Sequence, residues 1–144
     1  MVLYFEDFQP GAKIESQGLT VTEAHVVAFA GLTGDFNPLH LDEEYARRTI
    51  FGGRIAHGLL TLSLALGLFA PNIYGSTIAL LEASARFLKP VKIGDTIRVV
   101  TEVLDKKPTE KYEGGVVHLR HEVRNQRGEV VAVAETKILV SRRR

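Results

Sequence analysis

The residues with the clearest capacity for chemistry lie in one short segment. Asp35, Asn37 and His40 fall within six residues, around Pro38. Proline has no amide hydrogen and disfavours a helical conformation at the residue before it, so we expect this segment to be a loop. On a helix, side chains five positions apart would point about 140° away from each other. In a loop, Asp35 and His40 can converge on one small volume.

A carboxylate and an imidazole that lie close together suit general acid–base catalysis. Imidazole titrates near neutral pH, and partial burial of a carboxyl group raises its pKa toward that range. A second interpretation is structural: Asp35 caps the neighbouring turn and His40 is an ordinary loop histidine, as in many segments rich in Asp, Asn and Pro. The motif by itself leaves both interpretations open.

Gly58 is the second candidate, at the expected start of an apolar helix. The N–H groups in the first turn of a helix have no partner inside it, and a glycine lets a substrate approach closely. The Gly58 N–H can hold a thioester oxygen while negative charge develops on it, and one such donor is typically worth about 10²–10³ in rate. The alternative is that Gly58 only permits tight packing.

Three segments together resemble the MaoC-like dehydratases and (R)-specific enoyl-CoA hydratases. The hydratase motif of that family is similar to Gly34–Ala46, GDFNPLHLDEEYA. The start of its central helix is similar to Ile55–Leu64, IAHGLLTLSL, and its strand-and-turn segment to Arg86–Asp95, RFLKPVKIGD. The resemblance extends over most of the chain, from about Val2 to Val140.

The resemblance implies a role for each candidate. Asp35 and His40 would hold one water molecule and act as the catalytic pair. Asn37 would help to shape the substrate site, and the Gly58 N–H would be the oxyanion donor. The implied reaction is the reversible hydration of a trans-2-enoyl-CoA to an (R)-3-hydroxyacyl-CoA. It needs no metal and no cofactor, because coenzyme A is part of the substrate. The acyl chain, the direction and the choice between CoA and acyl carrier protein stay open.

Two other functions compete with hydration. A thioesterase on the same fold would use a carboxylate, often on the central helix, to activate water, but His57–Ala70 contains neither Asp nor Glu. The second alternative is a non-catalytic accessory protein that binds acyl-CoA. The presence of Asp35, Asn37 and His40 favours chemistry over binding alone.

The other histidines and Ser63 have simpler interpretations. We expect His25 to be solvated on the polar side of a helix. His118 and His121 are three positions apart on a predicted strand, so they face opposite ways and cannot share a metal ion. His57 is expected to shape the mouth of the pocket or to cap the apolar helix. The Ser63 hydroxyl would bond an earlier carbonyl or contact the substrate.

The expected partners follow from the same segments. Arg86, Lys89 and Lys92 lie near a strand end, where they would either contact the CoA phosphates or form a solvated charged rim. Domains of the implied fold usually pair through their sheets, which hides strand edges, so a homodimer or an assembly of dimers is expected. The net charge of +1 gives no reason to expect nucleic acid or an anionic membrane as a partner.

The composition fits one cytoplasmic domain over residues 1–144. The chain has no cysteine, which excludes disulfides, thiolate metal sites and a cysteine nucleophile. Glu6 and Asp7 stand where a secretion signal would need positive charge. The apolar run His57–Ala70 ends at Pro71, short of the roughly 20 residues needed to span a membrane, so we expect a buried helix.

The remaining pattern predicts an α+β domain. A first strand is expected at Lys13–Val21, followed by a helix that Thr22 caps and Gly34 ends, and by a short helix that Asp42 caps. Period-two alternation predicts four later antiparallel strands, at Leu81–Leu88, Thr96–Val103, Val117–Val123 and Gly128–Val140. The last two would be joined by a turn at Asn125–Gly128. A curved sheet wrapped around the apolar helix, as in a hot-dog fold, would supply the cover that this helix needs.

Overall fold

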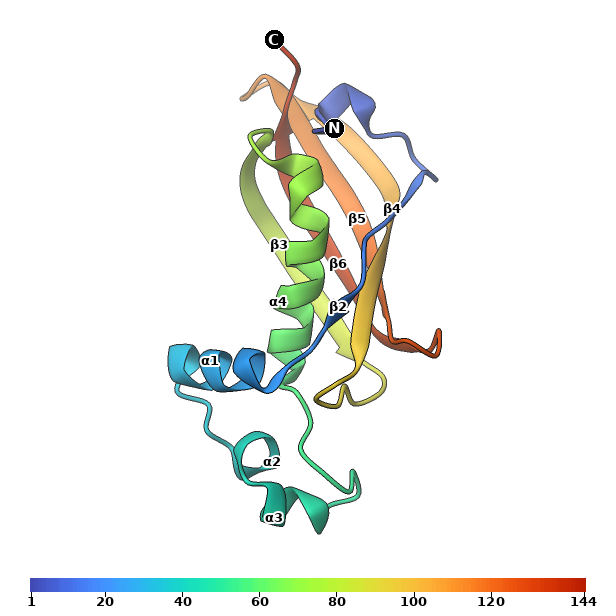
Figure 1. Ribbon diagram of the computed structural model, residues 1–144. Coiled ribbons are helices and arrows are strands. Elements are labelled where there is room, and N and C mark those ends of the chain that lie inside the picture. Colours follow the sequence, from blue (N-terminus) through green and yellow to red (C-terminus); the bar gives the residue numbers. More distant parts are fainter.

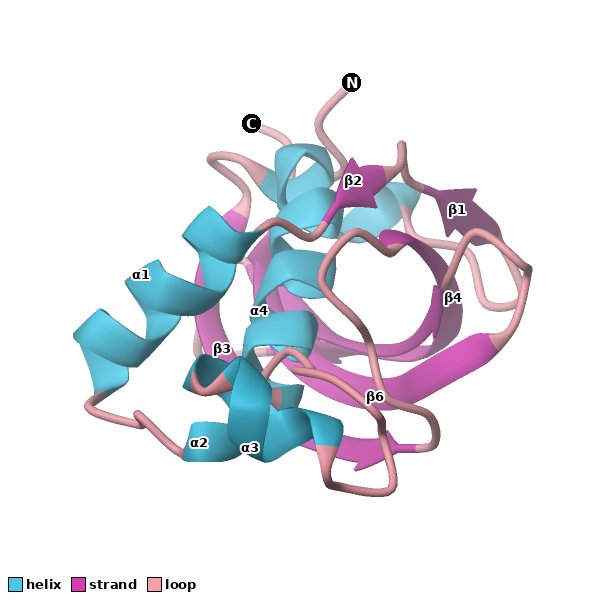
Figure 2. Ribbon diagram, turned by 60° about the horizontal axis from the view of Figure 1, so that its bottom comes forward, coloured by secondary structure: helices cyan, strands magenta, loops and turns pink.

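One curved antiparallel sheet and one central helix form the body of the molecule. The computed structural model describes residues 1–144. The sheet has the strand order β1-β4-β5-β6-β3, and β2 also pairs with β4. Figure 2 shows the strands curling around α4, with α1, α2 and α3 gathered at one end of that helix. This α+β layout is the hot-dog fold that the sequence predicts.

The helices occupy the first half of the chain. Short 3₁₀ turns lie at Phe5–Asp7 and Ala70–Ile73, and the α-helices are α1 Glu23–Thr33, α2 Pro38–Leu41, α3 Glu43–Arg47 and α4 Gly58–Phe69. None of them has both the length and the apolar character needed to cross a membrane.

The strands flank the helices in the sequence. They are β1 Lys13–Glu15, β2 Leu19–Thr20, β3 Thr77–Phe87, β4 Thr96–Thr109, β5 Gly114–Arg124 and β6 Val130–Ser141. The chain termini lie together at the end of α4 opposite to α1, α2 and α3 (Figure 1).

Capping residues fix the ends of the helices as predicted. The Thr22 hydroxyl accepts a hydrogen bond from the His25 N–H at 3.4 Å, and the His25 ring accepts one from the Thr22 N–H at 2.9 Å. Gly34 ends α1 at φ +83°, a left-handed conformation that favours glycine. The Asp42 carboxylate accepts from the Tyr45 N–H at 3.0 Å and begins α3. His25 is half-buried, and its ring takes part in this cap, a contact that the sequence interpretation did not include.

Two predicted elements differ in the structure. The expected first strand is split into β1 and β2, because the chain between Glu15 and Leu19 is one residue longer than the segment of β4 that it pairs with. The Ser16 hydroxyl accepts a hydrogen bond from the Val99 N–H at 2.9 Å within this bulge. The segment predicted to be a loop becomes helical at Pro38, since proline is tolerated in the first turn and Asn37 caps it.

The core lies between α4 and the concave face of the sheet. Leu60, Thr61, Ala65 and Phe69 are the buried residues of α4, and they face a layer that includes Ile97, Val99, Val103, Leu119 and Val123. The opposite side of the helix is less covered, and the Leu59 side chain is 61% exposed. The sheet therefore covers α4 on one side only, and the full cover expected from its sequence is absent in the single chain.

Candidate active site

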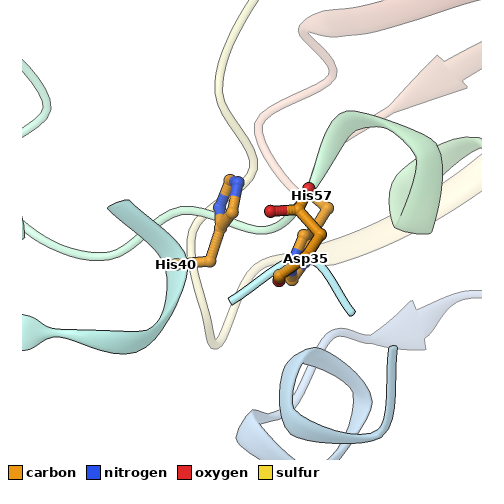
Figure 3. A group of neighbouring side chains, drawn as sticks. All are labelled: Asp35, His40 and His57. Carbon is orange, nitrogen blue, oxygen red and sulfur yellow. The ribbon is translucent and has the colours of Figure 1, made fainter. Parts of the chain in front are cut away.

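The loop after α1 and the start of α4 bring three titratable side chains together. Asp35 lies just beyond α1, His40 lies in α2 and His57 immediately precedes Gly58, the first residue of α4. One nitrogen or carboxylate oxygen from each lies within 4.8 Å of the others. Figure 3 shows the Asp35 carboxylate pointing toward the His40 ring. The predicted convergence of Asp35 and His40 is present, and His57 joins them.

The spacing between Asp35 and His40 suits a shared water molecule. Their polar atoms lie within 4.8 Å and form no direct hydrogen bond. A water that makes two hydrogen bonds of about 2.8 Å bridges atoms separated by about this distance. Asp35 is exposed, in contrast to the partial burial that the sequence interpretation assumed, whereas His40 is only 9% exposed.

A backbone carbonyl fixes the tautomer of His40. Its Nδ1 lies 2.7 Å from the carbonyl oxygen of Ile55, and a carbonyl only accepts hydrogen bonds. Nδ1 must therefore carry the proton and donate it to Ile55. In the neutral ring, Nε2 is then left with a lone pair that can take a proton from water. The same atom can return a proton once the ring is charged.

Gly58 offers an unpaired backbone donor beside this pair. It is the first residue of α4, so its N–H has no acceptor inside the helix, and it bonds to no other backbone or side-chain group. A β-carbon at this position would lie 3.2 Å from the Phe87 ring. Gly58 thus has the free N–H that the oxyanion role requires, and it also permits the close packing of the alternative interpretation.

Two hollows meet at these residues. One, of about 250 Å³, is lined by residues that include Asp35, His40, His57 and Gly58. The other, of about 410 Å³, has mostly apolar walls from Phe51, Ile55, Ala56, Phe87, Leu88, Pro90, Val91 and Val131. His40, Gly58 and Phe87 belong to both. The apolar hollow therefore adjoins the hollow that contains Asp35 and His57.

Asn37 has a structural contact rather than a place in these walls. Its side-chain oxygen accepts a hydrogen bond from the Leu39 N–H at 3.0 Å and so caps α2. Its own N–H donates to the Asp35 carboxylate at 3.3 Å. Asn37 therefore orients the loop that carries Asp35 and His40, and its contact with substrate stays a prediction.

Residues 7–125 match the family described as the MaoC like domain. The chain belongs to the MaoC-like family. This confirms the resemblance that the loop and helix motifs indicated.

Named relatives connect the family to hydration and dehydration. The chain is 41% identical to the 3-hydroxybutyryl-CoA dehydratase of Methylorubrum extorquens, over 74% of this chain and 68% of that protein. It is 36% identical to the (R)-specific enoyl-CoA hydratase of Rhodospirillum rubrum, over 76% and 75%. The solved structure of a protein titled monoamine oxidase regulatory protein from Archaeoglobus fulgius superposes with a TM-score of 0.91. It is 45% identical, and the alignment covers 99% of this chain and 97% of that one.

The three clustered side chains of this MaoC-like domain are also a possible set of metal ligands. A carboxylate and two imidazoles commonly hold divalent transition metals. An imidazole nitrogen binds a metal in the plane of its ring, but the His40 and His57 rings are stacked, with centroids 3.9 Å apart and planes inclined by 29°. One ring would have to leave the stack to share an ion with the other. The observed arrangement suits proton transfer better than metal binding.

Of the three cations predicted to lie near the CoA phosphates, one forms an ion pair and two are exposed. Lys89 lines that hollow and pairs with Glu129 at 2.5 Å. Hydrogen bonds from Lys89, Asn125 and Arg127 lower the pKa of Glu129 to about 2. Arg86 and Lys92 are exposed. Contact of these cations with CoA phosphates stays a prediction.

Proposed function

We propose that this MaoC-like protein hydrates a trans-2-enoyl-CoA to an (R)-3-hydroxyacyl-CoA and catalyses the reverse dehydration. One observation carries the proposal: the Asp35 carboxylate lies within 4.8 Å of a ring nitrogen of His40, whose Nε2 is free, and the unpaired N–H of Gly58 lines the same hollow. The names of the relatives support the same reaction class. No cofactor is needed beyond the CoA of the substrate.

The proposed hydration needs two proton transfers. One member of the Asp35/His40 pair removes a proton from the bound water as its oxygen bonds to the β-carbon. The other member donates a proton to the α-carbon, and the Gly58 N–H stabilises the negative charge that develops on the thioester oxygen. The base gains one proton and the acid loses one. Transfer of a proton from the base back to the acid then restores both groups to their starting states. Both groups act from one face of the double bond, so the hydroxyl group and the proton add to the same face, and we propose the (R) configuration from the name of the relative in Rhodospirillum rubrum.

The direct test is the hydration of crotonyl-CoA by the wild type and by single variants. Asp35→Ala and His40→Ala should each lower kcat by at least about 10²-fold, the low end for loss of a general acid or base. His118→Ala is a suitable control, because His118 pairs with Glu135 on the sheet, away from the hollows of the site. Rates near that of the wild type in both folded site variants would contradict the assignment.

The same preparations separate the alternative functions. Release of free CoA from a saturated acyl-CoA would indicate a thioesterase. Binding of acyl-CoA with neither hydration nor CoA release would indicate an accessory protein. The absence of a carboxylate from α4 argues against the thioesterase. We therefore expect hydration, with chiral analysis showing the (R)-3-hydroxyacyl product.

The functional unit of the proposal is a homodimer. The strand β3 forms a sheet edge of 11 residues that pairs only with β6. Ile78, Leu80 and Leu81 on this strand are 44%, 58% and 50% exposed, and Leu59 on α4 is also exposed. Exposure of a long strand edge and of apolar side chains to water is unfavourable. A second copy of the chain would cover both.

A further inference from the structure

His57 is almost fully buried beside the catalytic pair. His57 is 2% exposed, and its Nε2 lies 3.0 Å from the backbone carbonyl oxygen of Asp35. Because a carbonyl only accepts, Nε2 carries the proton and donates it to Asp35. The other nitrogen, Nδ1, is buried and has no hydrogen-bond partner. His57 thus ties the start of α4 to the main chain of Asp35, 22 residues earlier.

The His57 ring also supports the His40 ring. The two rings stack with centroids 3.9 Å apart, and Phe29 of α1 packs against His57 with centroids 4.9 Å apart. His40 is otherwise held by its hydrogen bond to Ile55 at 2.7 Å. A hydrogen bond at one ring atom leaves the ring free to rock about that atom. The stacked surface of His57 opposes this motion and sets the direction of the His40 Nε2.

Direct proton transfer by His57 does not fit its contacts. The Nε2 hydrogen is already donated to a carbonyl, and the buried Nδ1 has no hydrogen-bond partner to which it could pass a proton. A cation in the stack would also oppose the positive charge that His40 acquires when it takes a proton. These contacts suit a neutral ring that holds its neighbours in place.

We propose that His57 is a positioning residue that fixes both members of the catalytic pair: it holds Asp35 through its backbone and His40 through its ring. This inference rests on the proposed function of Asp35 and His40. Neither contact is visible in the sequence motif, because the three residues come from three separate elements. A displacement of reacting groups by about 1 Å can lower a rate about 10²-fold, so loss of both contacts should act mainly on kcat.

Three substitutions separate the two contacts. His57→Phe keeps a ring for the stack on His40 and loses the N–H. His57→Gln keeps an amide N–H that can reach the Asp35 carbonyl and loses the ring. His57→Ala loses both. We expect kcat for crotonyl-CoA hydration to fall about 100-fold in the Ala variant and about tenfold in the Phe and Gln variants, with KM within about threefold of the wild type.

A purely structural role would give a different result. Loss of folded protein would lower the number of active sites and leave kcat per folded site unchanged, so the folded fraction is measured in parallel. Near-normal kcat in the Ala variant, or a loss that neither Phe nor Gln partly restores, would overturn the proposal.

Imidazole nitrogen NMR gives a readout without substrate. In the wild type, His40 should show a single Nδ1–H tautomer and His57 a single Nε2–H tautomer. In His57→Ala, the His40 signals should broaden, because the ring is then free to rock about its hydrogen bond to Ile55. If the wild type lacks hydratase activity and the His40 signals still change in His57→Ala, the proposed function is refuted and the positioning role is kept. Unchanged His40 signals, with or without activity, would refute the positioning role.

Discussion

Gly58 illustrates how one residue can meet a chemical and a packing requirement together. Its N–H is free at the start of α4, and its α-carbon faces the Phe87 ring across a gap too narrow for a methyl group without adjustment. The three heavy atoms nearest to an added β-carbon are all ring atoms of Phe87, at 3.2–3.3 Å. The close contact therefore comes from one side chain of β3, which also lines both hollows.

This contact predicts a specific coupling between Gly58 and Phe87. Gly58→Ala should lower kcat/KM for enoyl-CoA hydration about tenfold, since the methyl group pushes the Phe87 ring into the space that the thioester must enter; contacting pairs couple by about 0.5–3 kcal/mol. In a Phe87→Ala background, adding Gly58→Ala should cost little further activity. A double-mutant cycle measures the coupling. Independent, multiplicative losses would show that the methyl group acts through something other than Phe87.

At the scale of elements, predictability depended on whether the deciding contact is local. Thr22, Gly34 and Asp42 mark helix ends through contacts within four residues, and the turn before Glu129 closes through the Asn125 carbonyl and the Gly128 N–H at 3.0 Å. These features were predicted from sequence. Asp35 and His40 were also named as candidates from the sequence, because their spacing and the resemblance to the family motif indicated the same two residues.

Features that depend on a distant partner were missed. The break after Glu15 is set by the register on β4, and the role of His57 is set by the Asp35 carbonyl and the His40 ring. Strand β4 continues to Thr109 because its charged end pairs with the start of β5, down to Gly114. That stretch shows no alternation of apolar and polar residues from which a strand could be predicted.

The exposed strand β3 and the open side of α4 give the prediction for assembly. Leu80→Glu should weaken the proposed dimer at least about tenfold, because a carboxylate buried in an apolar interface loses its hydration. Sedimentation over a concentration series measures the change. Ile50→Glu is a matched control, since Ile50 is 95% exposed and follows α3, outside β3. A wild-type chain that stays monomeric at high concentration would contradict the dimer, as would equal effects of the two substitutions.

At the scale of the whole molecule, one buried histidine joins three strands and the central helix. His121 of β5 is 1% exposed and makes hydrogen bonds of 2.8 Å to Thr101 of β4 and to Thr136 of β6. Phe69 of α4 meets its ring edge-on, with centroids 5.5 Å apart. Burial lowers the pKa of His121 from 6.5 to about 4. The interior of the fold is therefore built around a histidine whose neutral form is favoured by burial.

The lowered pKa of His121 gives a signed prediction for stability. Between pH 6.5 and about 4 the unfolded chain binds a proton at this position and the folded chain does not. Unfolding is therefore favoured as the pH falls through this window, and the contribution is fully present above it. The difference in pKa corresponds to about 3 kcal/mol of stability lost by pH 4.

Urea unfolding of the wild type and of His121→Gln across pH 4 to 7.5 measures this contribution. Glutamine can keep one hydrogen bond to a threonine and does not titrate, so the free energy of unfolding of the variant should vary less with pH. Carboxylates such as Glu129 affect both proteins alike and cancel in the difference. We expect the variant to be less stable at pH 7.5 and the two curves to converge toward pH 4. Parallel curves would mean that water reaches His121 in the folded protein, and that the core beneath α4 is open.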